Sequence, residues 1–246
     1  MNWATQLLSH CQALHASGRL SASSLIQATA YTLILNGRFL RYRDDFEDAL
    51  TQLCVARSLL DELASQASSS RGQALAIAFA DEIGPEIRYC AHELGNTKAY
   101  DIDAIVAETA SSHRSGLVEG YDKLVSELAQ ESAGGAAAER EKLKPLMWEE
   151  EPVPVRNPEL VDVLLKVQAA EEKLASAPSD STSVTPADGD KKGQVGKGTK
   201  SKQGVAAYDA ILLALSDAEG VVRKLVEAQQ VHVPINYFSR RKLIHL

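Results

Sequence analysis

Apolar side chains recur at helical intervals along most of this chain, and the clearest case lies between residues 30 and 60. The first half of this stretch carries large apolar residues around Gly37, namely Tyr31, Leu33, Ile34, Leu35, Phe39 and Leu40. In the second half the spacing is four, three and three, with Phe46, Leu50, Leu53 and Ala56. Such spacing keeps these side chains on one face of a helix. The polar run 41–45 separates the halves, with Asp44 as the predicted N-cap. The pattern therefore predicts two amphipathic helices packed as an antiparallel hairpin.

Small residues fall where the two helices of such a hairpin must approach closely. Gly37 lies in the first helix, and Ala49 and Ala56 lie in the second. The tetratricopeptide pattern has a small residue in its first helix and a small-x3-aromatic run in its second, within a unit of roughly 34 residues. This stretch fits with Leu53 in place of the aromatic residue, although Asp61 stands where a closing proline is expected. We therefore expect a tetratricopeptide-like hairpin, and the alternative is an ordinary helical hairpin with a packed interior.

Further helices are predicted before and after this hairpin. Residues 2–16 form an amphipathic pattern, and Ser21 or Ser23 is predicted to cap the helix that leads into the hairpin. A strongly apolar helix follows residue 70. We expect the Gly84-Pro85 pair to break or kink it, because proline removes an internal hydrogen bond and suits the first turn of a new segment.

The next part of the chain predicts shorter elements. Residues 100–109 favour a short helix, and the polar residues 111–115 favour a loop. A further helical stripe then runs at spacings of four, three and four through Leu117, Tyr121, Leu124 and Leu128.

The composition changes at Pro145. The prolines that follow exclude a helix, so we predict one short extended segment near residues 147–156, after which Pro158 opens a new helix. Residues 179–204 consist mainly of Ser, Thr, Gly, Asp and Lys, and they hold too little apolar surface to offset the entropy of ordering. The predicted organisation is a tetratricopeptide-like helical domain over 1–176, a disordered low-complexity loop over 177–204, a final helix over 205–230 that packs back on the domain, and a tail of undefined structure over 231–246.

The overall composition agrees with an all-α fold, because the chain is poor in aromatic residues and rich in Ala and Leu. Three cysteines, Cys11, Cys54 and Cys90, are far apart in the sequence and are expected to be reduced core residues. There is no apolar run of membrane-spanning length and no signal-peptide pattern, so we expect an intracellular, soluble protein without membrane insertion.

The search for catalytic, metal and cofactor motifs gives no candidate. His92-Glu93 begins like a zinc-protease motif, but Asn96 stands where the second histidine is required. The glycines and lysines of 189–202 lack the order of a phosphate-binding loop, and no GxSxG motif is present. We therefore predict a protein that is not an enzyme and that uses no metal or cofactor.

One group of residues is a candidate for binding nucleic acid. Arg38, Arg41 and Arg43 gather at the tip of the hairpin, with Tyr42 between them. Arginine forks match phosphates and an aromatic ring can stack on a base. The alternative is a solvated turn whose arginines pair with the neighbouring Asp44, Asp45 and Glu47. The net charge of −7 argues against nucleic-acid binding, because phosphate contacts need a basic surface.

Several sequence blocks resemble the RNA-binding region of the 68-kilodalton subunit of the signal recognition particle. The most specific is DEIGPEIRYCA at residues 81–91, which is similar to that family's E-I-x-P-x-I-R-Y-C segment and contains Arg88. The others are QATAY at 27–31, GRF at 37–39, FEDAL at 46–50, and Trp148 followed by PVPV at 152–155. The resemblance extends from about residue 24 to residue 230.

The resemblance implies a helical, tetratricopeptide-like domain that binds the particle's 7S RNA near a multi-helix junction. It implies no catalysis, and it implies a cytoplasmic protein with a nuclear or nucleolar assembly stage. The particle delivers ribosomes with signal sequences to the endoplasmic reticulum, so the ribosome is an indirect partner. We expect Arg38, Arg41, Arg43 and Arg88 to serve as phosphate or stacking contacts, together with Tyr42.

Two departures from the family pattern qualify this expectation. The basic helical segment that the family carries ahead of the matched part is not seen here, and neither is the C-terminal part that holds the 72-kilodalton subunit, so the chain resembles a piece shortened at both ends. A second hypothesis is a tetratricopeptide-like protein-interaction module without RNA affinity, whose concave helical face holds a peptide or helix.

Overall fold

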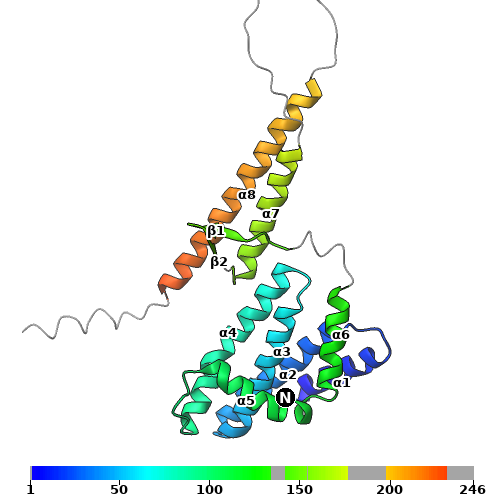
Figure 1. The fold of residues 1–246 in the computed structure, drawn as a ribbon, viewed down its shortest axis with the longest axis vertical. Helices are drawn as coiled ribbons and strands as arrows, with labels where there is room; N and C mark the ends of the chain where they lie inside the picture. The colour runs from blue at the N-terminus through cyan, green and yellow to red at the C-terminus, as the bar shows by residue number, and fades with distance from the viewer. Residues whose placement is uncertain (1, 134–141, 154, 177–197, 232–246) are drawn as a thin grey trace, which may run out of the picture. The chain divides into compact units, whose positions relative to one another are not determined.

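A computed structural model describes residues 2–133, 142–153, 155–176 and 198–231 (Figure 1). Within these ranges the elements are α1 (Asn2–Ala16), α2 (Ala22–Tyr42), α3 (Phe46–Ser65), α4 (Ser70–Glu93), α5 (Ile102–Leu117), α6 (Tyr121–Ala133), β1 (Leu146–Trp148), β2 (Glu151–Val153), α7 (Pro158–Ser176) and α8 (Gly198–Val231). The chain divides into two compact units, residues 1–142 with 146–158, and residues 143–145 with 159–246. The predicted all-α class is confirmed.

The predicted hairpin is formed by α2 and α3. A Cβ atom added at Gly37 would lie 2.7 Å from Leu53 Cγ and 3.3 Å from the carbonyl oxygen of Ala49, so any other residue would force one of the two helices to shift. Ala49, Leu53 and Ala56 are fully buried. The small residues therefore lie at the helix contact, as the sequence predicts, and Leu53 fills the position of the missing aromatic residue.

The caps of the hairpin helices agree with the prediction in one case and correct it in the other. Ser21 caps α2, where its hydroxyl accepts a hydrogen bond from Ser24 N at 3.2 Å. Asp45 rather than Asp44 is the residue before α3. Asp44 adopts a left-handed conformation with φ of 61°, because the chain reverses within three residues. The prediction of Asp44 as N-cap was therefore wrong by one position.

Helix α3 is the centre of the first unit, since it packs against α2, α4 and α5. Helix α4 runs without a break through Pro85, so the predicted break and new segment at this proline are corrected. The missing N–H costs one hydrogen bond on an exposed face, whereas Ile83 and Ile87 on either side are almost fully buried. Burial of these two side chains against the core outweighs the local loss.

The region after α4 also differs from the prediction. Helix α5 continues to Leu117, so the predicted loop at 111–115 is helical. Gly120, with φ of 66°, then separates α5 from α6. The predicted stripe is divided between two helices, although Tyr121 and the two leucines of α6 are buried as expected.

The segment near 147–156 is extended, as predicted, but it pairs with itself. Strands β1 and β2 form a two-stranded antiparallel sheet in which Leu146 lies opposite Val153. Glu149 and Glu150 make the turn with φ of 49° and 70°. Two successive glutamates are not a common signal for such a turn, so the pairing of these strands was not predicted from the sequence.

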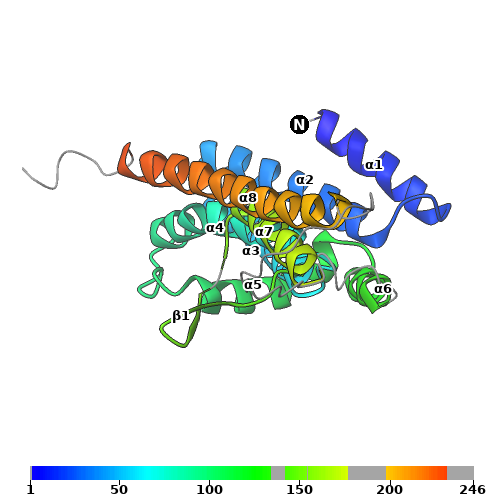
Figure 2. The same ribbon diagram turned by 90° about the horizontal axis from the view of Figure 1, so that it is seen from above.

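The second unit contains α7 and α8, which run antiparallel alongside each other (Figures 1 and 2). Helix α7 begins at Pro158, as predicted, and buries Val161, Val163 and Val167. Lys144 contacts this helix through an ion pair of 2.9 Å to Glu172. Helix α8 begins at Gly198, earlier than the predicted start at residue 205, so the last part of the predicted loop over 177–204 is helical. Residues 177–197 of that loop, and residues 232–246 of the tail predicted over 231–246, lie outside the described ranges.

None of the helices within the described residues combines the length and the apolar character that a membrane span requires. The same ranges hold no cluster of three or more His, Cys, Asp or Glu side chains arranged to bind a metal ion.

The close approach at Gly37 leads to a stability prediction. Gly37→Ala places a methyl group against Leu53 and should lower the free energy of unfolding by about 1–3 kcal/mol, because the core must shift to accept it. Guanidinium denaturation followed by circular dichroism measures the change. Gly116→Ala in α5 is the matched control, since nothing lies within 4 Å of the added atom, and it should leave stability unchanged or slightly raised. Equal effects of both substitutions would contradict this account of the helix contact.

The cysteines lead to a reactivity prediction. Cys54 and Cys90 are fully buried, and burial raises the pKa of Cys54 to about 12 and raises that of Cys90 as well, whereas Cys11 is half-buried. A thiol reacts as its thiolate, so a disulfide reagent at mildly alkaline pH should modify Cys11 first. Concentrated guanidinium chloride should expose all three. Rapid modification of more than one thiol in the folded protein would show that the core is looser than the structure indicates.

Candidate nucleic-acid interface

The predicted arginine group lies where the C-terminal end of α2, the start of α3 and the second half of α4 meet. Arg41 Nη1 lies 3.6 Å from Glu86 Oε2, which connects α2 to α4. The rings of Phe46 and Tyr89 contact edge to face at 5.9 Å between centroids, which connects α3 to α4. The site is therefore built by three helices, and the sequence analysis placed only the first two of them there.

Arg38 is held by two carboxylates of α4. Its Nε donates to Glu86 Oε1 at 2.9 Å and its Nη2 donates to Glu82 Oε1 at 2.9 Å. The hydrogen bond to Glu86 raises the pKa of Arg38, and partial burial opposes that shift. The Glu86 side chain is only 14% exposed, so this carboxylate is matched to Arg38 and Arg41 rather than to solvent. These two arginines thus link α2 to α4.

Arg43, Tyr42 and Phe39 form a more open surface. The Arg43 guanidinium lies 5.7 Å from the centre of the Phe39 ring, and that of Arg41 lies 5.3 Å from the Tyr42 ring. Tyr42 is 80% exposed, and the Arg43 side chain is 62% exposed. The 3.6 Å pair of Arg43 with Asp45 is the only one of the three pairings proposed for the turn that the described residues show. A solvated pair of this kind contributes little to stability.

Arg88 stands apart from the hairpin arginines. It is exposed on α4, and among the described residues it makes no ion pair. Arg88 lies on the same face of α4 as Asp81, Pro85 and His92. The residues that approach the hairpin arginines, namely Glu82, Glu86 and Tyr89, lie on the adjacent face. The structure therefore brings Arg38, Arg41, Tyr42 and Arg43 together but provides no contact between them and Arg88.

The sequence pattern did not identify the aromatic part of this surface or the acidic partners of its arginines. Phe39 and Tyr89 are both nearly half exposed, and they flank the arginines. The i, i+4 spacing of Phe39 and Arg43 was a readable signal for their contact. No comparable signal identified Glu82 and Glu86 as the partners of Arg38, because that pairing depends on how α4 packs across α3.

The helical hairpins and the exposed arginine and aromatic side chains are typical of a helical protein that binds RNA through phosphates and bases. Comparison with known families agrees: the profile described as RNA-binding signal recognition particle 68 matches residues 1–234. The chain belongs to this family, which confirms the resemblance seen in the sequence blocks. No solved structure matches the chain.

The two kinds of arginine lead to a prediction about stability. Arg38→Ala leaves the buried carboxylate of Glu86 with its other cation 3.6 Å away, so the free energy of unfolding should fall by about 1–2 kcal/mol after allowance for partial exposure. Arg88→Ala should stay within about 0.5 kcal/mol of the parent, because the residue is exposed and forms no ion pair in the described ranges. Thermal and guanidinium unfolding compare them. Similar losses of stability in the Arg38→Ala and Arg88→Ala variants would show that the ion pairs of Arg38 with α4 do not stabilise the fold.

Proposed function

We propose that this chain is a non-catalytic, RNA-binding part of the signal recognition particle that binds the particle's 7S RNA. The match of the RNA-binding family over residues 1–234 is the observation that carries this proposal. The helical fold and the exposed arginine–aromatic surface support it. Such a part would help to hold the particle together while the particle delivers ribosomes with signal sequences to the endoplasmic reticulum.

The residues of the candidate interface divide into two roles in this proposal. Tyr42, Arg43 and Arg88 are exposed and contact RNA, with the arginines on phosphates and the tyrosine stacked on an unpaired base. Arg38 and Arg41 are bound to Glu82 and Glu86, so they chiefly position the end of α2. They add positive charge close to the RNA without leaving their partners.

The acidic composition sets the expected strength of binding. With a net charge of −7, the chain as a whole repels phosphates, so binding depends on the local surface. Few phosphate contacts mean a modest affinity and a shallow dependence on salt. A more basic segment elsewhere in a longer protein would raise both.

The partners and location follow from the family and belong to the same proposal. The 7S RNA would be the direct partner, the 72-kilodalton subunit would be a protein partner within the particle, and the ribosome would be an indirect partner. The protein would act in the cytoplasm after a nuclear or nucleolar assembly stage.

The proposal is tested by a titration against the particle RNA at two salt concentrations, with an unrelated structured RNA as the comparison. Arg43→Ala with Arg88→Ala should weaken binding to the particle RNA about tenfold. The plot of log affinity against log salt should lose about one unit of slope for each phosphate contact removed.

The matched control for this titration is Arg19→Ala with Lys98→Ala, which removes two exposed cations elsewhere in the same unit. This control should leave affinity and slope nearly unchanged. If both double variants lost RNA affinity equally, the loss would be due to the change in net charge, and Arg43 and Arg88 would not belong to the site. Equal and weak binding of the parent protein to both RNAs would favour a protein-interaction module without RNA affinity.

A further inference from the structure

An apolar groove of about 490 Å³ crosses the first unit between α2 and α4. Both helices pack on α3 and leave a strip of it uncovered, so Leu60 and Leu63 form the floor. Leu128 of α6 closes one side. The RNA-binding proposal makes no use of this feature, whose lining is mainly aliphatic and aromatic.

The walls of the groove carry large apolar side chains that water reaches. Tyr31 on α2 is 53% exposed, and Leu75 and Phe79 on α4 are 41% and 48% exposed. Leu75 and Phe79 are four residues apart, so they project on the same face of α4 toward the groove that they line. A contiguous exposed patch of this kind, bounded by polar residues, is typical of a protein-binding surface.

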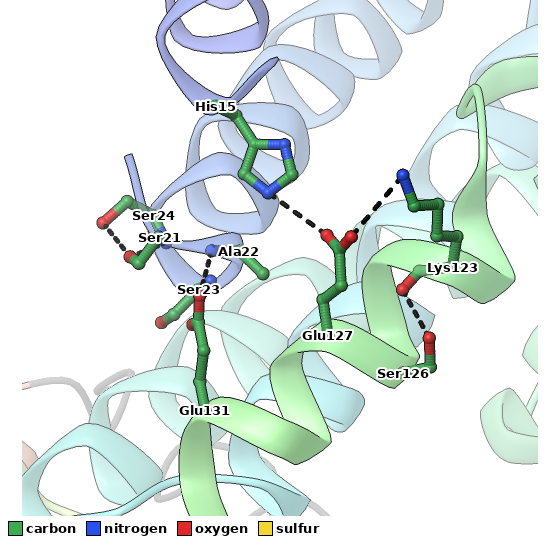
Figure 3. Close-up of polar contacts among 9 residues, drawn as sticks. All are labelled: His15, Ser21, Ala22, Ser23, Ser24, Lys123, Ser126, Glu127 and Glu131. Atoms are coloured by element: carbon green, nitrogen blue, oxygen red, sulfur yellow. Dashed lines mark hydrogen bonds and ion pairs between the residues drawn. The ribbon is translucent and has the colours of Figure 1, made fainter. Parts of the chain in front are cut away.

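Polar contacts hold the groove open at both ends. At one end Arg38 bridges α2 to α4 through Glu82 and Glu86. At the other end Glu131 of α6 reaches the start of α2, where its carboxylate accepts hydrogen bonds from Ala22 N at 2.7 Å and Ser23 N at 3.2 Å (Figure 3). A carboxylate at a helix N-terminus is also favoured by the helix dipole. The groove is therefore formed before any ligand enters.

The charges around the groove indicate what kind of ligand fits. Glu82 and Glu131 lie on its rim, and Arg38, the only cation among the described residues of the lining, is paired with Glu82. Two carboxylates and one guanidinium leave the lining with a formal charge of −1. The leucines of the floor offer no hydrogen-bond donors to a phosphate, and the serine and glutamine side chains of the lining carry no charge that would attract one. The rim carboxylates would repel a phosphate. A polypeptide that buries apolar side chains and places Lys or Arg beside these carboxylates fits both properties.

The dimensions favour a helix as the bound form. The α4 wall extends from Gly72 to Ile83, which is roughly 16 Å at 1.5 Å per residue. About three turns of a bound helix span this length, and apolar residues at i, i+4 and i+7 would face the floor. We propose that this groove binds a cationic amphipathic helix of a protein partner, independently of the RNA surface.

A synthetic helix tests this proposal. An 18-residue fluorescent peptide of Leu and Lys, with its leucines on one helical face, is titrated against the whole chain and followed by anisotropy. A scrambled peptide of the same composition should bind at least tenfold more weakly, because it cannot present one apolar face. Leu75→Gln with Phe79→Gln should also weaken binding of the amphipathic peptide at least tenfold.

The matched control is Leu7→Gln with Leu14→Gln, which changes two apolar residues of α1 that are 47% and 42% exposed and lie outside the groove. Circular dichroism melting establishes that both double variants are folded. Peptide affinity of the control should equal that of the parent. Equal loss in both variants, or equal binding of the scrambled peptide, would overturn the proposal.

The same variants separate this site from the RNA surface. Leu75→Gln with Phe79→Gln should leave the affinity for particle RNA unchanged. If this variant lost RNA binding and kept peptide binding, the groove would be assigned to RNA and the proposal would be wrong. A parent protein that binds the peptide but not the particle RNA would refute the RNA-binding function and leave the groove proposal standing.

Discussion

The contact of Gly37 with Leu53 and Ala49 is the constraint on which the first unit depends. It lets α2 lie so close to α3 that a Cβ atom at position 37 would come within 2.7 Å of Leu53. This approach buries one face of α3 and leaves two further faces, on which α4 and α5 pack. The position of α4 relative to α2 then follows from their common contact with α3. Both proposed sites are consequences of that arrangement, since each uses residues of α2 and α4.

The ion pairs of Arg38 show that this packing of α2 and α4 engages an arginine inside the protein rather than leaving it free for a ligand. A guanidinium at this place could face solvent and bind a phosphate, but Glu86 lies where α4 crosses the end of α2 and accepts from it at 2.8–2.9 Å. The carboxylate is largely removed from water, so losing its partner would leave a poorly solvated charge. Stability and RNA affinity therefore place different demands on neighbouring arginines. In the proposed function, the more exposed Arg43 and Arg88 meet the second demand.

Local patterns in the sequence were sufficient for the parts of the fold that depend on neighbours in the chain. The helical hairpin, the cap at Ser21 and the helix start at Pro158 each rest on residues a few positions apart, and each is confirmed. Pro85 was misleading because its local cost is small beside the burial of Ile83 and Ile87, which is a tertiary effect. The self-pairing of β1 and β2 was missed because Glu149 and Glu150 carry no strong turn signal. The arginines of the candidate site were readable, but their partners on α4 and the groove were not, since both require knowing which helices share α3.

Arg38 lies at the boundary between the two proposed surfaces, because it lines the groove and also borders the arginine–aromatic group. The two surfaces nevertheless differ in chemistry. On one side the guanidinium groups of Arg41 and Arg43 lie over aromatic rings, and the Arg43 side chain is 62% exposed, which suits phosphates and bases. On the other side an aliphatic floor is framed by carboxylates, which suits a cationic helix. Because Arg38 stays bound to Glu82 and Glu86, it separates the positive surface from the acidic rim of the groove. The same pair of helices, α2 and α4, therefore presents a positive surface and an acidic groove within a few helical turns of each other. In the proposed function, this local positive surface is what allows a chain with a net charge of −7 to bind RNA.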